Sequence, residues 1–183
     1  MMFSVPVRDD VSLVLAEPRY AAEVAELIAR NFDRLGQYQP WGETPPDADT
    51  MRKSLQERAE AFAQGRGVRT YIRRPGGFIG ACGLRIDVGS QSAEVGFFID
   101  REHEGRGLAS ACVSVLTDLA FAEYGMVRVT LKTHVGNLRS RALAERLGFS
   151  YEGTARGGIR FGADRFEDEA VYAVLSHEWA SDR

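Results

Sequence analysis

The chain has 183 residues, of which 44% are hydrophobic and 27% charged, and this predicts one globular domain over residues 1–183 with a substantial core. Its formal net charge of −3 at pH 7 provides no basic field for nucleic acid or an anionic membrane, and no window is apolar for long enough to cross a bilayer. The two cysteines, Cys82 and Cys112, form no disulfide framework, so we expect a cytoplasmic protein.

The first hundred residues predict two helices followed by a group of strands. The alternation over residues 11–15 is typical of a strand. A helix is expected to begin at Pro18, where the missing N–H costs nothing, and to end at Gly36. Beyond it we expect a loop over 37–46, a second helix over about 47–64, and strands over 68–73, 78–87 and 93–100. Strands joined by such short turns indicate an antiparallel meander.

The pattern changes after residue 100. A helical stripe of apolar residues begins at Leu108, and a strand is expected over 127–133. Asn137 is predicted to cap a helix that reaches Leu147 and stops at Gly148. We expect final strands over 149–156 and 166–178, separated by a glycine-rich hairpin tip over 157–162. This order predicts a mixed α/β (α+β) fold with an antiparallel first half and about four helices packed on the sheet.

The run Gly105-Arg106-Gly107-Leu108-Ala109 lies between a predicted strand and a predicted helix. Its two glycines allow backbone N–H groups to approach an anion without side chains in the way. The helix adds its free N-terminal N–H groups and the positive end of its dipole. The run therefore predicts a phosphate site.

The glycine run has three competing interpretations. No Gly-x-x-x-x-Gly-Lys-Ser/Thr run exists, which argues against a P-loop. A dinucleotide fingerprint belongs after the first strand of a parallel sheet, with an acidic residue about 20 positions further on, and that position is Gly125 here. A glycine-rich helix start without any ligand remains the simplest alternative.

A second segment, Val135–Ser140 followed by Glu145–Phe149, lies one strand further on. Together the two segments resemble the GNAT superfamily of acyl-CoA-dependent N-acyltransferases, whose phosphate loop Gln/Arg-x-x-Gly-x-Gly/Ala falls on Glu104–Ala109. The chain is also similar to the ribosomal-protein-serine acetyltransferase branch of that family. That similarity rests on residues 31–35, 40–41, 93–98, 137–140, 147–149, 152–153 and 178–179.

The resemblance implies a GNAT-type central mixed sheet and direct transfer from acetyl-CoA to an amine, with a protein N-terminus as acceptor and a homodimer as assembly. We expect no metal, because His103, His134 and His177 have no ligand spacing. Tyr38 and Trp41 are expected to line the acceptor site, although Trp41 is as well explained as a hydrophobic plug. The donor-binding residues implied by the resemblance are Phe97, Phe98, Ile99, Glu104, Gly105, Arg106, Gly107, Leu108, Ala109, Asn137 and Ser140.

Glu104 departs from the family pattern, because a carboxylate beside a pyrophosphate is unfavourable. We expect its side chain to point to solvent or to pair with Arg101 or Arg106, and we expect the loop backbone to carry donor binding. In the family two neighbouring strands splay apart, and a backbone N–H in the segment matching Phe97–Ile99 polarises the thioester carbonyl. For the side chains of Phe97 and Phe98, core packing is the simpler explanation.

Two residues are candidates for proton transfer. Glu94 is our candidate to accept the amine proton through a water, because an apolar strand would raise the pKa of its carboxyl; a solvent-facing residue or one paired with Arg85 is the alternative. The tyrosine that protonates the thiolate in many relatives aligns with Ala144, so Ser140 is our candidate acid. Its alternative role is helix capping beside Asn137.

The sequence leaves other functions open. A small-molecule amine such as an aminoglycoside, a polyamine or an amino acid would use the same donor site, and the donor could be another acyl-CoA. A non-catalytic CoA-binding module belongs to a different class, and thiol release across a panel of amines separates it from an enzyme.

Overall fold

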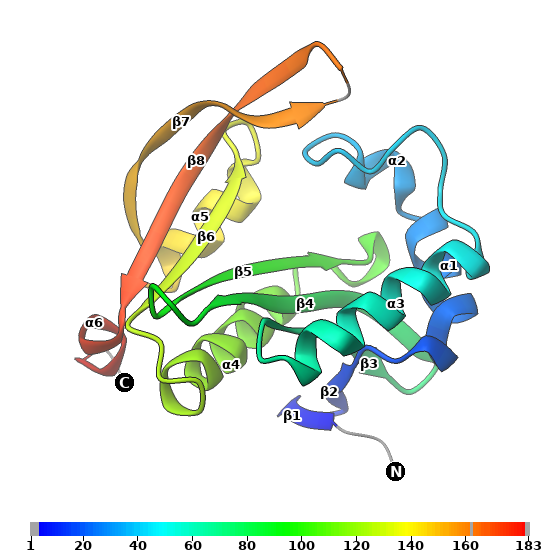
Figure 1. The fold of residues 1–183 in the computed structure, drawn as a ribbon, viewed down its shortest axis with the longest axis horizontal. Helices are drawn as coiled ribbons and strands as arrows, with labels where there is room; N and C mark the ends of the chain where they lie inside the picture. The colour runs from blue at the N-terminus through cyan, green and yellow to red at the C-terminus, as the bar shows by residue number, and fades with distance from the viewer. Residues whose placement is uncertain (1–3, 162, 182–183) are drawn as a thin grey trace.

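The computed structural model describes residues 4–161 and 163–181, which build one eight-stranded sheet in the order β1-β2-β3-β4-β5-β6-β8-β7 (Figure 1). The strands are β1 Ser4–Arg8, β2 Val11–Leu15, β3 Gly67–Arg74, β4 Gly77–Asp87, β5 Ser92–Ile99, β6 Arg128–His134, β7 Ser150–Phe161 and β8 Arg165–Leu175. The helices are α1 Ala21–Ala29, α2 Phe32–Leu35, α3 Ala48–Ala63, α4 Leu108–Ala122, α5 Leu138–Arg146 and α6 Ser176–Ser181, with 3₁₀ turns η1 Pro18–Tyr20 and η2 Arg101–His103.

The sheet confirms the predicted mixed topology. Each adjacent pair from β1 to β5 is antiparallel, and β8 is antiparallel to both β6 and β7. The two groups meet where β5 runs parallel to β6. The expected meander is therefore correct over β3 to β5, and α4 supplies the crossover that a parallel pair requires.

Hydrophobic side chains pack on both faces of the sheet. Leu116 of α4 and Leu143 of α5 belong to one buried cluster, whereas Leu27 of α1 and Leu55 of α3 belong to a second cluster with Ala81 of β4. Successive strand residues alternate between the two faces, which explains how β4 contributes to both clusters. Because α1 packs on β4 and α3 on β3, the second face stays open over β6 to β8 in the described part of the chain (Figure 1).

Strands β5 and β6 are paired over their first halves. The pairs join Ser92–Val95 to Arg128–Leu131, yet β5 continues to Ile99 and β6 to His134. The two strands then diverge, as Figure 1 shows. A gap therefore opens in the middle of the sheet, as the resemblance implied.

The single helix expected over 18–36 is wrong, because the chain forms η1, α1 and α2 instead. The break lies at Asn31, which is fully buried and has φ −117° and ψ 2°. Its side-chain amide donates to the carbonyl of Leu27 at 2.9 Å, and its Oδ1 accepts from the backbone N–H of Arg101 at 3.1 Å. A side chain that bonds to the backbone in this way competes with regular helix geometry.

The C-terminal elements also differ from expectation. The predicted glycine tip over 157–161 is strand, because Gly157 (φ 62°) lies in a bulge of β7 where its N–H bonds to Asp168 at 2.9 Å. Gly162 lies outside the described residues. The last strand ends at Leu175 rather than at 178, because the Glu178 carboxylate accepts from the Leu175 N–H at 2.8 Å and begins α6. Strand β1 was not predicted.

The buried cluster under α4 should dominate stability. Leu116 is fully buried in it, so Leu116→Ala should lower the free energy of unfolding by about 2–5 kcal/mol through lost burial and a residual cavity. Leu138→Ala is the matched control, because Leu138 is 69% exposed and its truncation should change stability by about 0.5 kcal/mol or less. Urea unfolding measures both, and equal losses would contradict this picture of the core.

Candidate functional site

A cavity of about 890 Å³ lies at the gap. Its walls come from α2 and the loop after it, the end of β5, the glycine loop with the start of α4, and α5. It brings together most of the residues that the sequence singled out. These are Tyr38, Phe97, Phe98, Ile99, Glu104, Gly105, Gly107, Leu108, Ala109, Asn137 and Ser140.

The glycine loop has the backbone geometry of an anion site. Gly105 (φ 73°) and Gly107 (φ 70°) are both in the left-handed region, which side chains other than glycine rarely adopt. Gly107 is the N-cap residue of the 15-residue helix α4, and the first turn of that helix contains no acidic side chain. The free N–H groups of that turn and the helix dipole therefore act on whatever occupies this end of the cavity.

Arg8 of β1 supports the loop from outside the cavity. Its guanidinium donates a hydrogen bond to the carbonyl of Arg106. This contact spans 98 residues of sequence, so no local pattern could have revealed it. Arg106 itself is exposed and does not line the cavity. Its predicted part in donor binding therefore involves its backbone rather than its side chain.

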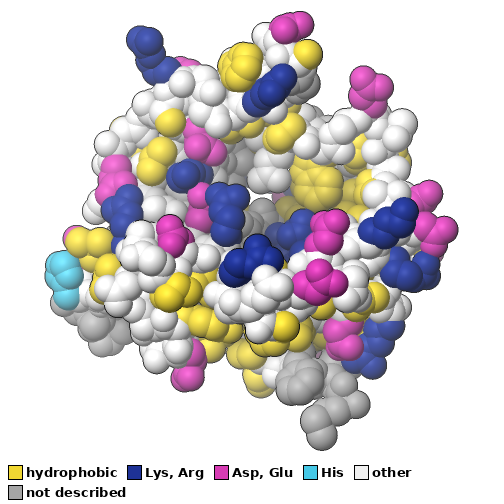
Figure 2. Space-filling view, in the orientation of Figure 1, with side chains coloured by type: hydrophobic (Ala, Val, Ile, Leu, Met, Phe, Trp, Pro, Cys, Tyr) yellow, Lys and Arg dark blue, Asp and Glu magenta, His cyan; other side chains and the backbone are white. Residues whose placement is uncertain are grey.

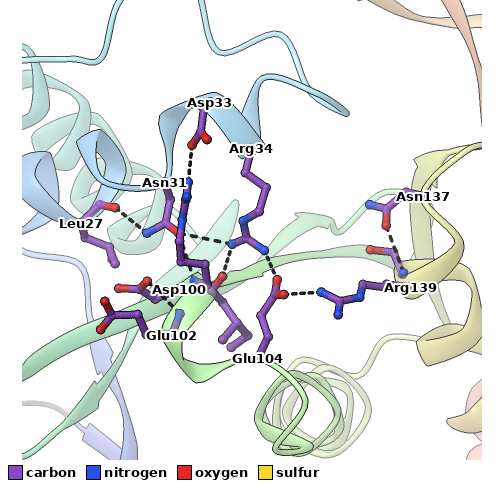
Figure 3. Close-up of polar contacts among 12 residues, drawn as sticks. Leu27, Asn31, Asp33, Arg34, Asp100, Glu102, Glu104, Asn137 and Arg139 are labelled. Atoms are coloured by element: carbon purple, nitrogen blue, oxygen red, sulfur yellow. Dashed lines mark hydrogen bonds and ion pairs between the residues drawn. The ribbon is translucent and has the colours of Figure 1, made fainter.

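The expected partners of Glu104 are wrong. Its carboxylate pairs with Arg34 of α2 through Oε1 and with Arg139 of α5 through Oε2 (Figure 3). Arg101 pairs with Asp33 instead. The Glu104 side chain is 25% exposed, so it does not point freely into solvent.

The segment that carries Arg34 is anchored to the end of β5. Arg30 donates to the Asp100 carboxylate at 2.6 Å and to the carbonyl of Phe78 at 2.7 Å. Burial alone would raise the pKa of Asp100, but the Arg30 guanidinium and neighbouring N–H donors together hold it below the usual value. Asp100 is therefore a charged anchor that fixes α1 and α2 beside the cavity.

The backbone of β5 faces the gap at alternate residues. The N–H of Asp100 donates to the carbonyl of Ile79 in β4 at 2.8 Å. Backbone groups of successive residues point to opposite sides of a strand, so the N–H and C=O groups of Ile99 and Phe97 point away from β4. The carbonyl of Ile99 accepts from Arg34. Phe97 is thus the residue whose N–H and C=O face the opening.

The side chains of Phe97 and Phe98 pack on opposite faces of the sheet. Phe97 contacts the cluster under α4, and Phe98 contacts the cluster under α1 and α3. Trp41 packs edge-on against Phe98, with ring centroids 6.1 Å apart, and it does not line the cavity. Tyr38 does line it, 5.6 Å from the ring of His134. Of the two aromatic residues expected at the acceptor site, Tyr38 reaches the cavity and Trp41 supports its floor.

Asn137 caps α5 as predicted, because its Oδ1 accepts from the backbone N–H of Ser140 at 3.2 Å. Both residues line the cavity, so capping and ligand contact are compatible. Arg141, one residue further, donates to the carbonyl of Val135 at 3.1 Å and to the hydroxyl of Tyr172 at 3.1 Å, which fixes α5 beside β6 and β8. Ala144 is fully buried.

Glu94 lies outside the cavity wall on the open face of the sheet. It pairs with Arg85 at 2.7 Å and Lys132 at 3.2 Å, so charged groups replace the apolar surroundings assumed from the sequence. Glu169 of β8 faces the same group, and burial, opposed by the charge of Lys132, raises the pKa of its carboxyl. Since pairing ends one residue beyond Glu94, this charged group lies at the closed end of the gap. Figure 2 shows charged side chains of both signs around the hollow on this face.

The two cysteines are free and fully buried. Burial raises the pKa of both thiols, and that of Cys112 reaches about 12, so neither is a thiolate near neutrality. Within residues 4–161 and 163–181, no group of three His, Cys, Asp or Glu side chains is placed to hold a metal ion. No helix in these ranges is long and apolar enough to span a membrane.

Comparison with known proteins points in one direction. The model of the acetyltransferase (GNAT) domain family matches residues 12–150. The protein YdaF of Bacillus subtilis (strain 168) is provisionally named a ribosomal N-acetyltransferase. It is 34% identical to this chain over 184 aligned residues, which cover 100% of both proteins. The ribosomal-protein-serine acetyltransferase of Escherichia coli (strain K12) is 26% identical over 177 residues, which cover 96% of this chain and 98% of that protein.

Solved structures agree. A crystal structure described as a probable acetyltransferase is 34% identical, with a TM-score of 0.87 over 97% of this chain and 99% of the other. The structure of RimL, a ribosomal L7/L12 α-N-protein acetyltransferase, in complex with coenzyme A also has a TM-score of 0.87, over 94% of this chain and 98% of that one. At 23% identity this second likeness shows a shared fold.

The glycine loop can be tested with two equally strained variants. Gly107→Ala and Gly65→Ala each place an alanine at φ +70°, and neither Cβ would meet an atom closer than 3.6 Å. Each should therefore lose about 1 kcal/mol of stability from backbone strain. Only Gly107→Ala should also weaken binding of acetyl-CoA, the expected donor, as measured by calorimetry. Equal donor affinity in the two variants would show that the loop is not the phosphate site.

Proposed function

This chain belongs to the GNAT acetyltransferase family and is an acetyl-CoA-dependent N-acetyltransferase, and we propose that its acceptor is the N-terminal amine of a protein, with a ribosomal protein as the first candidate. The names of its relatives support this choice. The structural observation that carries it is the open face beside the gap, flanked by the β7–β8 hairpin and the segment around α2 (Figures 1 and 2). A hollow open on one side suits the end of a polypeptide better than a fully enclosed small amine.

The geometry supports the following reaction. The acceptor nitrogen attacks the thioester carbonyl carbon, and the N–H of Phe97, which faces the gap, stabilises the negative charge that develops on the carbonyl oxygen. The carbonyl then re-forms as the C–S bond breaks, and Ser140 on the cavity wall passes its hydroxyl proton to the departing thiolate and takes one from water. The donor is held at its phosphate end by the glycine loop and at its amide groups by Asn137 and the exposed edge of β5.

Glu94 remains our candidate for accepting the amine proton, through a water. Its position at the closed end of the gap, on the open face, supports this role. Its ion pairs with Arg85 and Lys132 support the alternative, in which it is part of a charged surface. Substitution of Glu94 distinguishes the two.

Three wider expectations accompany this proposal. We propose that residues 1–183 act as one catalytic domain and that the protein works as a homodimer, which light scattering tests. We also propose a cytoplasmic location, and the two free, buried cysteines support a reducing compartment.

An acceptor panel tests the substrate class. With acetyl-CoA as donor, peptides carrying a free N-terminus of a ribosomal protein should be acetylated with a kcat/KM about tenfold or more above that of aminoglycosides, polyamines and free amino acids. Thiol release measures turnover, and mass spectrometry identifies the modified amine. N-terminally blocked peptides are the control. A small amine that outperforms every peptide would refute the proposed acceptor and leave the family assignment intact.

Single substitutions test the proton-transfer residues. Ser140→Ala should lower kcat by about 100-fold, because a positioned acid contributes that much or more. Ser114→Ala, on α4 and away from the cavity wall, is the matched control and should keep full activity. Glu94→Gln should lower kcat, because the group that accepts the amine proton is lost. If Ser140→Ala and Glu94→Gln both leave turnover unchanged, these two roles are wrong.

A further inference from the structure

Three charged side chains meet above the glycine loop, and we call them the Glu104 clasp: Arg34 from α2, Glu104 from the loop, and Arg139 from α5 (Figure 3). We propose that Arg34 and Arg139 bind a phosphate group of the acetyl donor, and that the Glu104 carboxylate occupies the phosphate position until the donor displaces it. This inference rests on acetyl-CoA as donor and is independent of the acceptor.

The clasp lies inside the donor cavity. Arg34, Glu104 and Arg139 all line it, together with Gly105 and Gly107 of the phosphate loop. The two arginines come from elements on different walls, and the carboxylate bridges them. A phosphate bound at the loop would therefore lie within reach of the same two guanidinium groups.

The bridging geometry suits an anion with more oxygens than a carboxylate. Each oxygen of Glu104 accepts from a different arginine, Oε1 from Arg34 and Oε2 from Arg139. Guanidinium groups bind carboxylates and phosphates by the same charge-assisted hydrogen bonds. A phosphate group supplies further oxygens for the N–H groups at the start of α4, and a higher negative charge for the two cations.

Arg34 lies among charges of both signs. Burial and the cations Arg101 and Arg139 lower the pKa of Arg34. The carboxylates of Asp100 and Asp33 oppose this shift without cancelling it. Its Nε is buried and has no hydrogen-bond partner among the described residues. An incoming group of higher negative charge is favoured at such a position.

Stability alone does not explain the Arg139 side of the clasp. The Arg139 side chain is 80% exposed, and ion pairs of such exposed groups contribute little to folding. Arg34 also donates to the carbonyl of Ile99, which faces the gap. If Arg34 turns toward a phosphate, that carbonyl becomes free to accept from an amide N–H of the donor's pantetheine arm, so one exchange prepares both parts of the donor site.

The proposal predicts opposite effects for the two signs of charge. Glu104→Gln should bind coenzyme A more tightly, by about tenfold, because the competing carboxylate is gone, and Arg139→Gln should bind it at least about tenfold more weakly. Isothermal titration calorimetry with coenzyme A measures both. Asp49→Asn and Arg52→Gln remove the two partners of an exposed ion pair on α3, outside the cavity, and should leave the affinity unchanged.

The double variant Glu104→Gln/Arg139→Gln tests whether the two side chains act on one group. The gain from Glu104→Gln should largely disappear when Arg139 is absent. Titration with dephospho-coenzyme A and with 4′-phosphopantetheine identifies the phosphate: the Arg139→Gln loss should vanish for the ligand that lacks it. Thermal unfolding of every variant checks the fold.

Several results would overturn the inference. They are an unchanged or weaker affinity in Glu104→Gln, an unchanged affinity in Arg139→Gln, or additive effects in the double variant. Because only donor binding is measured, these results leave the proposed acceptor untouched. Conversely, failure of every peptide acceptor would leave the clasp in place.

Discussion

The early end of the pairing between β5 and β6 is the constraint on which the site depends. Four residue pairs, from Ser92 with Arg128 to Val95 with Leu131, join the antiparallel first half of the sheet to the second half. Beyond them the backbone of Phe97 has no neighbouring strand, and a buried backbone group without a partner is costly. The sheet therefore keeps the opening accessible to water or to a ligand with its own amide groups. The pantetheine arm of acetyl-CoA is such a ligand.

The gap is open to both faces of the sheet. The glycine loop and the N-terminus of α4 lie on the face that α4 and α5 cover, where Arg8 supports the loop through the carbonyl of Arg106. The charged group around Glu94 lies on the opposite, open face. A donor held from one side and an acceptor that approaches from the other meet at the diverging strands, without competing for the same surface. This arrangement suits direct transfer in a ternary complex.

Local patterns predicted the elements that are determined locally. The Asn137 cap, the loop glycines 105 and 107, and the meander over β3 to β5 all depend on residues near one another in sequence. The broken helix lies where a distant contact decides the outcome, because Asn31 bonds to the backbone of Arg101, 70 positions away. The early end of the last strand has a local cause that the strand pattern did not reveal. The Glu178 carboxylate accepts from the N–H of Leu175, three positions earlier, and α6 replaces the end of the strand.

The same distinction applies to the site. Phosphate-loop glycines have a sequence signature, whereas the partners of Glu104 lie 70 and 35 positions away on other elements. Proximity in sequence suggested Arg101 and Arg106, but Arg101 is held by Asp33. The sequence also could not predict the face of the sheet on which Glu94 lies. Alternation in a strand defines two faces but does not identify the one that helices cover.

The segment around α2 connects the Glu104 clasp with the part of the cavity proposed for the acceptor. A four-residue helix has little stability of its own, so tertiary contacts must hold α2 in place. Those contacts are Arg30 with Asp100, Asn31 with the N–H of Arg101, and Arg34 with both Glu104 and the carbonyl of Ile99. The same segment continues to Tyr38 on the cavity wall. A donor that exchanges partners with Arg34, as proposed, acts on the segment that carries Tyr38. If this changes the affinity for an acceptor, linkage requires the acceptor to change the affinity for the donor by the same factor.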